Sequence, residues 1–431
     1  MKKGKKRSIP IKLHVTGCTV YGSRGLPACR PLPGTGKLPV ARDCQPRFGC
    51  GRSIMKKTLN DKRRYAQQEV RHMLRIGMLT SGGDCQALNA TMRAIYKSVA
   101  HNAKEPFEFY GFQDGYKGLM YNKYRMLTAD DFTGILTVGG TILGTSRVPF
   151  KDIRKPDENG NDKVEMMKHT YNELELDCLV VLGGNGSLKT ANLLSQEGLN
   201  VIAMPKTIDN DLWGTDMTFG FQSAVDIATR AIDEIHTTAS SHGRVFIVEI
   251  MGHKTGWLPL NAGIAGGADI ILLPEIPYSM DKIVEVIEKK KTNNAGRFMI
   301  LAVAEGAISQ EDKKLSKKEY KKQLQNYMFP SVSYKLAAEI EERTGREVRV
   351  TVPGHTQRGG MPDAYDRVFA SRLGSEGGRM ICEGAFGFMV AYKNREIVRV
   401  PLEDAAGKLK LVQPDSTIIN EARMLGISFG D

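Results

Sequence analysis

Short runs of apolar residues recur along the chain and alternate with longer segments in which apolar and polar positions follow a helical period. The short runs carry little charge, which is typical of strands buried on both faces of a parallel sheet. They lie at residues 76–79, 178–182, 201–204, 245–250, 270–273 and 298–304, and further strands are expected at 346–352 and 388–401. Because strands and helices alternate almost throughout, the pattern predicts a three-layer α/β protein with mostly parallel sheets.

The helical segments lie at residues 87–99, 219–235, 282–291, 310–322 and 363–383. In the second of them, Phe221, Ala228 and Ile235 share an apolar face with four other residues, so this stripe is interpreted as core. The third and fourth are rich in charge and are expected to present solvated faces. A chain of 431 residues is long enough for two or three domains. We expect Rossmann-like sheets in two similar lobes, with the active site between them.

Positive charge is concentrated at the start of the chain. The formal net charge is +13, but residues 1–74 hold 18 lysines and arginines against three acidic residues, which leaves 43 basic and 45 acidic residues for 75–431. The body is therefore not a basic protein, and no nucleic-acid partner is expected. Residues 1–74 are interpreted as a basic, disordered extension, because their first part shows no sustained period. Met55 or Met73 could be the true start of the domain, which would make the extension an artefact of start-site choice.

The positions of the cysteines and the hydropathy of the chain indicate the cellular compartment. Cys85, Cys178 and Cys382 are scattered through the body, which suits a reducing environment. The other four of the seven cysteines precede residue 51 and lack the paired spacing of zinc modules. No window reaches about 18 uncharged apolar residues, so no membrane span is predicted. We expect a cytoplasmic protein without a membrane partner.

The apolar run at 178–182 ends in the sequence GGNGS, residues 183–187, which we call the donor turn. Glycines let the backbone approach a ligand closely, and the N–H groups at the start of the following helix can then hold an anion. The next apolar run, 201–204, ends in PKTIDND, residues 205–211, which we call the catalytic turn.

The catalytic turn carries two carboxylates at i and i+2, Asp209 and Asp211, beside Lys206 and Thr207. Two acids in this setting could divide the work between accepting a proton and holding a cation. The two turns are separated by one helix and one strand. Open α/β sheets bind ligands at the carboxyl ends of neighbouring strands, so we expect both turns at one site.

Three further glycine-rich turns are candidates for phosphate binding. Gly83 lies in a turn after the first strand, and the segment 139–147 ends on Arg147, which could be fixed over a phosphate. The third turn, 353–360, contains His355 and Arg358 and follows a strand that contains Arg349. Two arginines and a histidine around a glycine turn could hold a phosphate monoester.

Seven motifs occur together and in one order: LTSGGD at 79–84, GGTILGTSR at 139–147, GGNGS at 183–187, PKTIDND at 205–211, SSHGRVFIVEIMGH at 240–253, AEG at 304–306 and PGHTQRGG at 353–360. In these motifs and their order the chain resembles the phosphofructokinase family over residues 75–431, with a body of two α/β lobes. The resemblance implies an ATP-dependent kinase that phosphorylates D-fructose 6-phosphate at its 1-hydroxyl to fructose 1,6-bisphosphate, the committing step of glycolysis.

The resemblance also implies roles for individual residues. Asp209 would be the base for the sugar hydroxyl, with Thr207 beside it, and Asp211 and Asn185 would lie near Mg²⁺. ATP would be held by Gly83, Arg147, Gly184, Asn185, Gly186, Ser187 and Lys206. Fructose 6-phosphate would be held by Thr207, Asp209, Arg244, Met251, Gly252, His253, Glu305, Arg349, His355 and Arg358. Because Arg244 and Arg349 would reach the sugar phosphate from a neighbouring subunit, a homodimer or homotetramer is expected.

The chain departs from the family pattern at three positions. Many members have an aspartate at Asn185 and an arginine at His253, so a metal-site charge is missing and transition-state charge would rest more on Arg147 and Lys206. Lys206 resembles the pyrophosphate-using members, whereas Gly186 leaves room for a nucleotide. We interpret the combination of Gly186 and Lys206 as typical of the ATP-using branch of the family's intermediate, mixed-substrate group.

Three alternatives stay open from the sequence. A pyrophosphate-dependent phosphofructokinase would run the same reaction reversibly. An NAD or lipid kinase would share the donor turn but not the motifs at 205–211 and 353–360. A non-catalytic regulatory subunit would explain Asn185 and His253 but not the retained carboxylate of Asp209.

Overall fold

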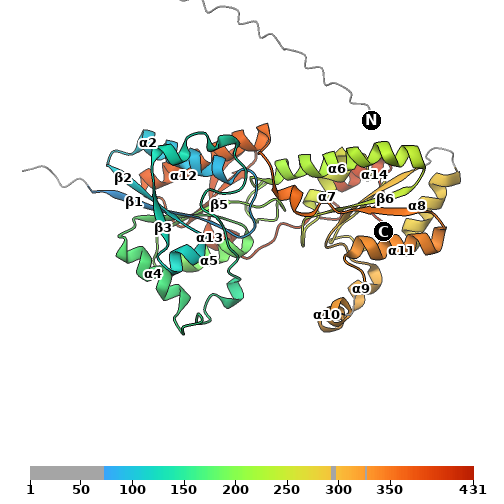
Figure 1. Ribbon diagram of the computed structural model, residues 1–431, viewed down its shortest axis with the longest axis horizontal. Helices are drawn as coiled ribbons and strands as arrows, with labels where there is room; N and C mark the ends of the chain where they lie inside the picture. The colour runs from blue at the N-terminus through green and yellow to red at the C-terminus, as the bar shows by residue number, and fades with distance from the viewer. Residues whose placement is uncertain (1–71, 293–297, 326–327) are drawn as a thin grey trace, which may run out of the picture. The chain divides into compact units, whose positions relative to one another are not determined.

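The computed structural model describes residues 72–292, 298–325 and 328–431 (Figure 1). The chain divides into two units, Met1–Gln68 and Glu69–Asp431. The first unit lies outside the described residues, and so does the predicted extension 1–74 apart from its last three positions. The fold described below is that of the second unit, which contains two lobes, each built on its own sheet.

The larger sheet has seven strands in the order β11-β10-β5-β4-β1-β2-β3. Its five central strands run parallel, and β3 and β11 pair antiparallel at the two edges. The strands are β1 Leu74–Ser81, β2 Phe107–Phe112, β3 Tyr124–Leu127, β4 Cys178–Gly183, β5 Val201–Pro205, β10 Phe388–Lys393 and β11 Glu396–Pro401. Every residue of β4 and β5 is buried, as expected of central parallel strands covered on both faces.

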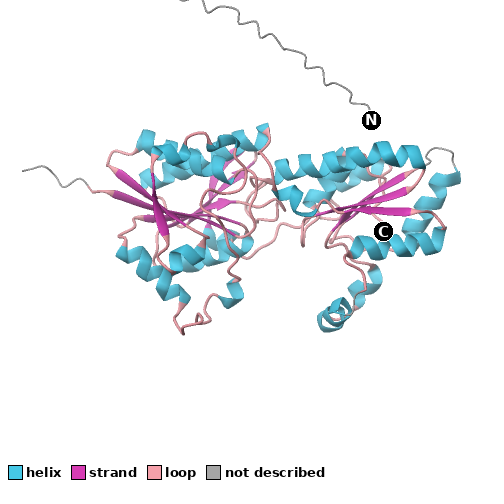
Figure 2. Cartoon of the chain, viewed as in Figure 1, coloured by secondary structure: helices cyan, strands magenta, loops and turns pink. Residues whose placement is uncertain are grey.

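Helices cover both faces of this sheet (Figure 2). Val180 of β4 belongs to a core shared with helices α2 and α12, whereas Leu179 and Val181 belong to a core shared with α4 and α5. Strand side chains therefore alternate between two helical layers, which gives the predicted three-layer architecture. The helices of this lobe are α2 Leu88–Asn102, α3 Tyr116–Met120, α4 Lys163–Glu173, α5 Asn185–Gln196, α12 Ala364–Glu383 and α13 Leu402–Ala405, with 3-10 turns η1 Ala129–Phe132, η2 Ile135–Thr137 and η3 Phe150–Asp152.

The smaller sheet has four parallel strands in the order β7-β8-β6-β9. They are β6 Val245–Ile250, β7 Ile270–Leu272, β8 Met299–Ala304 and β9 Val348–Thr351. Phe246 and Ile250 of β6 contribute to the core on the side of α6 and α7, and Val245 and Ile247 to the core on the side of α8 and α11. The helices of this lobe are α6 Phe221–His242, α7 Trp257–Ala265, α8 Met280–Thr292, α9 Gln310–Lys314, α10 Lys317–Gln325, α11 Val332–Thr344 and α14 Thr417–Met424, with the 3-10 turn η4 Gly354–Arg358.

The chain passes between the lobes more than once. After building the smaller sheet it returns to the larger one, where β10 pairs with β5 through Phe388 opposite Ile202 and Met389 opposite Ala203. Residues beyond α13 then cross back, and α14 joins the smaller lobe (Figure 1). The strand that carries the catalytic turn is therefore completed on one side by a strand from much later in the chain.

Two predicted helices differ from the observed ones. The predicted helix 310–322 is wrong as a single element, because the chain adopts an extended conformation at Leu315, where ψ is 144°, between α9 and α10. Ser316 restarts the helix: its hydroxyl accepts from the Glu319 N–H (3.3 Å) and the Glu319 carboxylate accepts from the Ser316 N–H (2.9 Å). The helix predicted at 219–235 begins at Phe221 and runs on to His242, where Gly243 (φ 66°) ends it.

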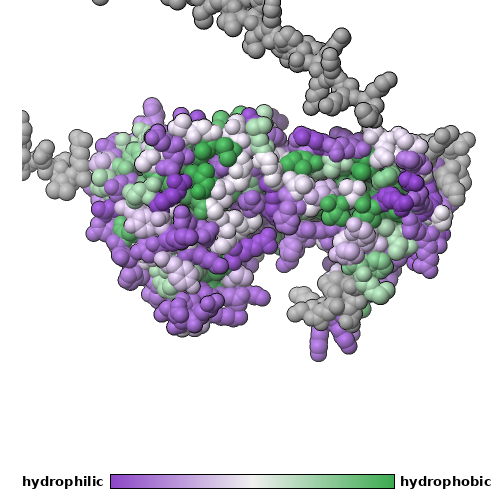
Figure 3. Space-filling model, in the orientation of Figure 1, coloured by the Kyte–Doolittle hydropathy of each residue, from purple (hydrophilic) through white to green (hydrophobic). Residues whose placement is uncertain are grey.

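The visible face of the molecule is largely hydrophilic, with hydrophobic residues in separate patches (Figure 3). Among the helices that the structure describes, none combines the length and the apolar composition needed to cross a bilayer.

Candidate active site

Most of the predicted site residues line one pocket between the two sheets. Its volume is about 640 Å³, and it lies at the carboxyl ends of β1, β4 and β5 in the larger sheet and of β6 and β8 in the smaller. This is where parallel α/β sheets place their ligand sites. The predicted residues that line it are Gly83, Arg147, Gly184, Asn185, Gly186, Ser187, Lys206, Thr207, Asp209, Asp211, Met251, His253, Glu305, His355 and Arg358.

The donor turn joins β4 to helix α5 and is fixed from two sides. The Ser187 hydroxyl lies 3.0 Å from that of Ser81, and the hydroxyl of buried Tyr116 donates to the Ser187 carbonyl at 2.8 Å. The first turn of α5 contains no acidic residue. Its free N–H groups and the positive end of the helix dipole therefore remain available to an anion.

Gly186 leaves open space above the start of α5. A Cβ atom placed there would meet no heavy atom of the described residues within 4 Å, so the backbone itself does not require glycine. Gly83 is different, because a Cβ there would lie 2.7 Å from a guanidinium nitrogen of Arg358. The glycine at 83 leaves room for the guanidinium of Arg358, whereas the glycine at 186 leaves room in the pocket.

Lys206 at the end of β5 crosses the pocket floor. Its side chain is buried, and its ammonium donates to the carbonyl oxygen of Gly83. Burial lowers the pKa of Lys206, and the positive charge of Arg358 acts in the same direction. Asp209 and Asp211 oppose this shift. Lys206 therefore ties the turn after β1 to the catalytic turn and brings positive charge to the same floor.

Asp209 and Asp211 both face the pocket. One buried carboxylate oxygen of each, Oδ1, has no hydrogen-bond partner among the described residues. Burial, together with the charge of Asp209, raises the pKa of Asp211 to about 6. Thr207 accepts from the Asp209 N–H at 3.1 Å, so the hydroxyl predicted to stand beside the base contacts its backbone. Two buried, unpaired carboxylate oxygens indicate that the turn is completed by a cation or a donor group.

The chemistry of these donors fits Mg²⁺, which prefers carboxylate and carbonyl oxygens and usually keeps several waters. The amide nitrogen of Asn185 donates to the carbonyl of Lys408 at 2.8 Å, which leaves its amide oxygen as the group for a cation. No cluster of three or more His, Cys, Asp or Glu residues suited to a metal occurs in the described part of the chain. Two carboxylates are enough for an ion that shares its coordination with substrate phosphates.

On the side of the smaller lobe, backbone groups hold the candidate sugar-binding residues. The Met251 N–H donates to the Gln357 side chain at 3.2 Å, and the His253 N–H donates to the Glu305 carboxylate at 2.9 Å. Arg358 donates to the carbonyl of Asp84 at 3.1 Å, and its buried Nε has no hydrogen-bond partner among the described residues. Arg358 thus lines the pocket while one of its buried donors lacks a partner in the described part of the chain.

Arg147 extends from a loop that is tied to the first glycine turn. The Gly82 N–H donates to the Ser146 carbonyl at 3.1 Å, and the Thr145 hydroxyl donates to the Gly82 carbonyl at 2.7 Å. The exposed Arg147 side chain lines the pocket together with residues that sequence reasoning missed, Ser81, Gly82, Val148, Pro149 and Phe150. Ser81 and Gly82 belong to the LTSGGD motif at 79–84, which is the signal that could have identified them, whereas Val148, Pro149 and Phe150 are marked only by their position directly after Arg147.

Three predicted residues lie outside the pocket lining. Gly252 lies between two pocket residues and adopts a φ of 147°. Arg244 immediately precedes β6, and Arg349 lies in β9, where it pairs with Phe246 of β6. Both arginines pair with the carboxylate of Glu347, the first at 2.5 Å. They lie toward the amino-terminal ends of the strands, away from this chain's own pocket, which lies at the carboxyl ends.

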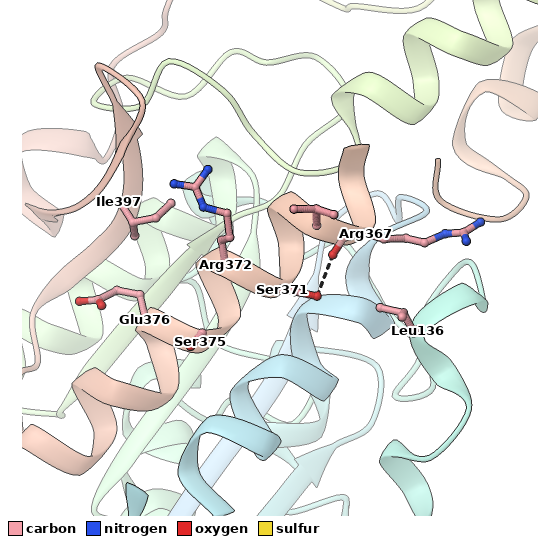
Figure 4. Close-up of a pocket in the computed structure, with 8 residues that line it drawn as sticks. Leu136, Arg367, Ser371, Arg372, Ser375, Glu376 and Ile397 are labelled. Atoms are coloured by element: carbon pink, nitrogen blue, oxygen red, sulfur yellow. Dashed lines mark hydrogen bonds between the residues drawn. The ribbon is translucent and has the colours of Figure 1, made fainter. Parts of the chain in front are cut away.

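A second cavity of about 580 Å³ lies over the outer face of α12. Two arginines line it, Arg367 and Arg372, but their side chains extend in different directions (Figure 4). Glu376 at its edge is paired with Arg399 at 2.7 Å. This cavity contains none of the predicted site residues.

The fold and the pocket are those of a phosphotransferase: parallel strands present to one pocket an anion-binding helix start and two carboxylates, each with one buried oxygen that is unpaired among the described residues. The chain belongs to the phosphofructokinase family, since the family model described as "Phosphofructokinase" matches residues 75–381. The fold and family predictions are thereby confirmed.

Curated relatives include enzymes that differ in phosphoryl donor. The chain is 52% identical over 358 residues to an ATP-dependent 6-phosphofructokinase of Spirochaeta thermophila, which covers 82% of this chain and 97% of that protein. It is 44% identical over 345 residues to a pyrophosphate–fructose 6-phosphate 1-phosphotransferase of Amycolatopsis methanolica, covering 79% of this chain and 97% of the relative.

A solved structure shares the fold. The crystal structure of Pichia pastoris phosphofructokinase in the T-state matches with a TM-score of 0.65 at 32% identity, over 78% of this chain and 36% of the yeast chain. The chain thus spans about a third of the length of that subunit.

Proposed function

We propose that the chain transfers the γ-phosphoryl group of ATP to the 1-hydroxyl of fructose 6-phosphate, which forms fructose 1,6-bisphosphate and commits the sugar to glycolysis. Relatives named ATP-dependent 6-phosphofructokinase, at up to 52% identity and nearly full length, confirm the predicted activity class. The observation that carries the proposal is the meeting of the donor turn and the two unpaired carboxylates in one pocket.

The donor assignment rests on one position. Overall identity does not separate the donors, since a relative named for pyrophosphate is 44% identical and several named for ATP are 43% identical. Gly186 does bear on it, because the open space above it is where the bulk of a nucleotide would lie. A lysine at 206 is compatible with either donor, since its ammonium is already engaged by the Gly83 carbonyl.

Asp209 is the proposed general base. Its carboxylate lines the pocket, and a sugar hydroxyl within hydrogen-bond reach of the carboxylate would lose its proton to it as the phosphoryl group is transferred. Thr207 holds the backbone of the base through the contact with the Asp209 N–H. Proton removal contributes one factor among several, because positioning and charge stabilisation dominate phosphoryl transfer.

The negative charge that spreads over the transferring group is stabilised by fixed donors. Arg147, Lys206 and the N–H groups at the start of α5 border the same space. Mg²⁺, when bound by Asp211 with Asn185 nearby, supplies charge neutralisation on the phosphates. Gly83 and Gly184 carry no side chain, so the backbone can come close to those phosphates, and Ser187 lies in the first turn of α5 beside them.

The sugar phosphate is assigned to residues of the smaller lobe. Met251, Gly252, His253 and Glu305 form the loop ends after β6 and β8, and His355 and Arg358 come from η4. The unpaired Nε of Arg358 supports a phosphate contact.

A homo-oligomer, dimer or tetramer, is part of the proposal. Arg244 and Arg349 lie away from this chain's pocket, and both pair with the carboxylate of Glu347. Because Arg349 is exposed and Arg244 is half-buried, either side chain can move from Glu347 toward a sugar phosphate bound to another subunit. Light scattering that returned a fully active monomer would contradict this part.

The experiment that tests the function is a coupled assay of the full chain with fructose 6-phosphate, Mg²⁺ and one donor at a time. ATP should support steady turnover, and pyrophosphate should support turnover at least about a hundredfold slower in kcat/KM, because a small donor makes fewer of the contacts that position it. Turnover with pyrophosphate alone would reverse the donor assignment, and turnover with neither would favour the non-catalytic alternative.

Asp211→Asn should stabilise the metal-free protein while it removes activity. The folded pKa of Asp211, about 6, lies above its ordinary value of 3.8, so the folded state holds the extra proton between those values and the stability from this group falls as pH rises through them. Removing the charge should therefore raise the free energy of unfolding near neutral pH by up to roughly 3 kcal/mol.

This gain should shrink to about 1 kcal/mol near pH 4.5 and vanish only below about pH 3, where the wild-type carboxyl is protonated in both states. Denaturant titrations in a chelator at about pH 4.5 and about pH 7.5 measure the difference. An equal effect of the substitution at both pH values would show that the carboxyl is not held in its neutral form by burial.

A further inference from the structure

Residues 408–412, which follow α13, run alongside the end of the catalytic turn, and we call them the strap. The Lys408 carbonyl accepts from the side chain of Asn185 in the donor turn at 2.8 Å. Leu409 bridges antiparallel to Leu212, and the Lys410 N–H donates to the Asp211 carbonyl at 2.9 Å. The strap thus contacts both turns that the proposed reaction uses.

The other end of the strap is held by the smaller lobe. The Trp257 ring N–H donates to the Lys410 carbonyl at 2.7 Å. One carboxylate oxygen of Glu275 accepts from the Val412 N–H and from the Gly256 N–H, each at 3.0 Å. Gly256 immediately precedes α7, so the strap links the donor and catalytic turns to the lobe that provides the candidate sugar-binding residues.

The Lys410 side chain makes the most specific contacts in the strap. Its ammonium donates to the Asn210 side-chain oxygen at 2.9 Å, to the Thr215 carbonyl at 3.0 Å and to the Asp216 carbonyl at 2.7 Å. These three contacts use all three ammonium protons. The ammonium also lies 5.5 Å from the centre of the Trp257 ring, within the range of a cation–π interaction.

Asn210, the residue that Lys410 holds, stands between the two carboxylates. It adopts a φ of 51°, in the left-handed region, and its side-chain oxygen also accepts from the Thr218 N–H at 3.1 Å. A non-glycine residue in this conformation persists when its surroundings hold it there. Because Asn210 is bonded directly to Asp209 and Asp211 in the chain, its backbone angles set where both carboxylates point.

We propose that Lys410 is a positioning residue for phosphoryl transfer: by binding the Asn210 side chain and two carbonyls beyond it, it holds Asp209 and Asp211 in their reactive orientation. The inference rests on the proposed function. Lys410 contacts the turn through Asn210 and is not among the residues that line the pocket. Its loss should therefore reduce the rate of the chemical step more than it weakens substrate binding.

Lys410→Met keeps the length of the side chain and removes its donors. In the assay above, we expect kcat to fall about tenfold or more, while the KM for each substrate changes less than about threefold, because small misplacements of reacting groups are costly to rate. Lys410→Arg restores a charged donor and should recover part of the lost rate. Lys393→Met, the same change at an exposed residue at the end of β10, is the matched control.

A second readout does not depend on activity. Hydrogen exchange of the segment 206–219 should become several-fold faster in Lys410→Met than in the wild type, with no change in the control, because the hydrogen bonds within this turn lose an anchor. Unchanged exchange would overturn the positioning role even if the proposed function held. Faster exchange in a chain whose wild type shows no turnover would instead point to failure of the proposed function.

Asn210→Gly provides the variant that tests the route of the effect. Glycine tolerates the left-handed φ but lacks the side-chain oxygen that Lys410 binds. If Lys410 acts through Asn210, the losses of kcat in the single variants will not add in the double variant. Three outcomes would contradict the proposal. The first is full additivity of the two single variants, and the second is a kcat within about twofold of wild type in Lys410→Met. The third is a parallel change in kcat and both KM values together with a loss of cooperative unfolding.

Discussion

Asp209→Asn is expected to lower kcat by roughly a thousandfold or more while the affinity for fructose 6-phosphate stays within a few-fold of wild type. The amide has nearly the shape of the carboxylate, so it preserves the fit of the turn, but it cannot accept the proton of the sugar hydroxyl. The measurement combines steady-state rates with binding of the sugar phosphate followed by calorimetry.

The matched control for this substitution is Asp233→Asn, which makes the same change at an exposed position on α6. It should leave both the rate and the binding unaltered. If Asp209→Asn retained a tenth or more of the wild-type kcat, Asp209 would not be the base, and the neighbouring Asp211 would become the candidate. A loss of sugar binding as large as the loss of rate would assign Asp209 to binding.

Gly186→Asp is expected to reduce kcat/KM for ATP by about a hundredfold or more, because a carboxylate close to the donor phosphates adds repulsion of several kcal/mol and occupies nucleotide space. The fold should tolerate the change. A Cβ at this position meets no described atom within 4 Å, and an acid in the first turn of α5 stabilises the helix by about 0.3–1 kcal/mol.

Gly186→Ala distinguishes the effect of added volume from the effect of added negative charge, because it adds one carbon without a carboxylate. It should keep most of the ATP-dependent activity, while thermal unfolding of both variants should match or exceed that of the wild type. A Gly186→Asp variant that used ATP normally would remove the argument for the donor. Activity with pyrophosphate gained by the same variant would show that this single position selects between the two donors.

The central strands of the fold could be predicted because all of their residues are buried in an apolar environment. The strands at 178–182 and 201–204 are buried on both faces, so their sequences are continuously apolar and match β4 and β5 closely. The edge strand β3, Tyr124–Leu127, was not predicted, since it is short and only one of its four residues is buried. The break between α9 and α10 was missed because the surrounding charges suit one solvated helix.

The candidate site was predictable where function is concentrated in short motifs. Most predicted residues line one pocket because the motifs follow parallel strands that end at one edge. Gln357 and Lys410 were not identified as supports, although they contact Met251 and Asn210. Their partners lie far away in sequence, and no local pattern distinguishes a lysine that holds a turn from one on the surface.

The late pairing of β10 with β5 has a consequence for synthesis of the chain. The strand that carries the catalytic turn ends at Pro205, but the strand that covers its free edge begins only at Phe388. At bacterial or eukaryotic rates of translation, this leaves an apolar strand without its neighbour for on the order of ten seconds or more. During that time it is an open sheet edge, the kind of surface to which other unfinished chains add strands. Chaperones should therefore bind mainly the lobe of the larger sheet during synthesis, and this need should end when the last strands of that sheet have been made.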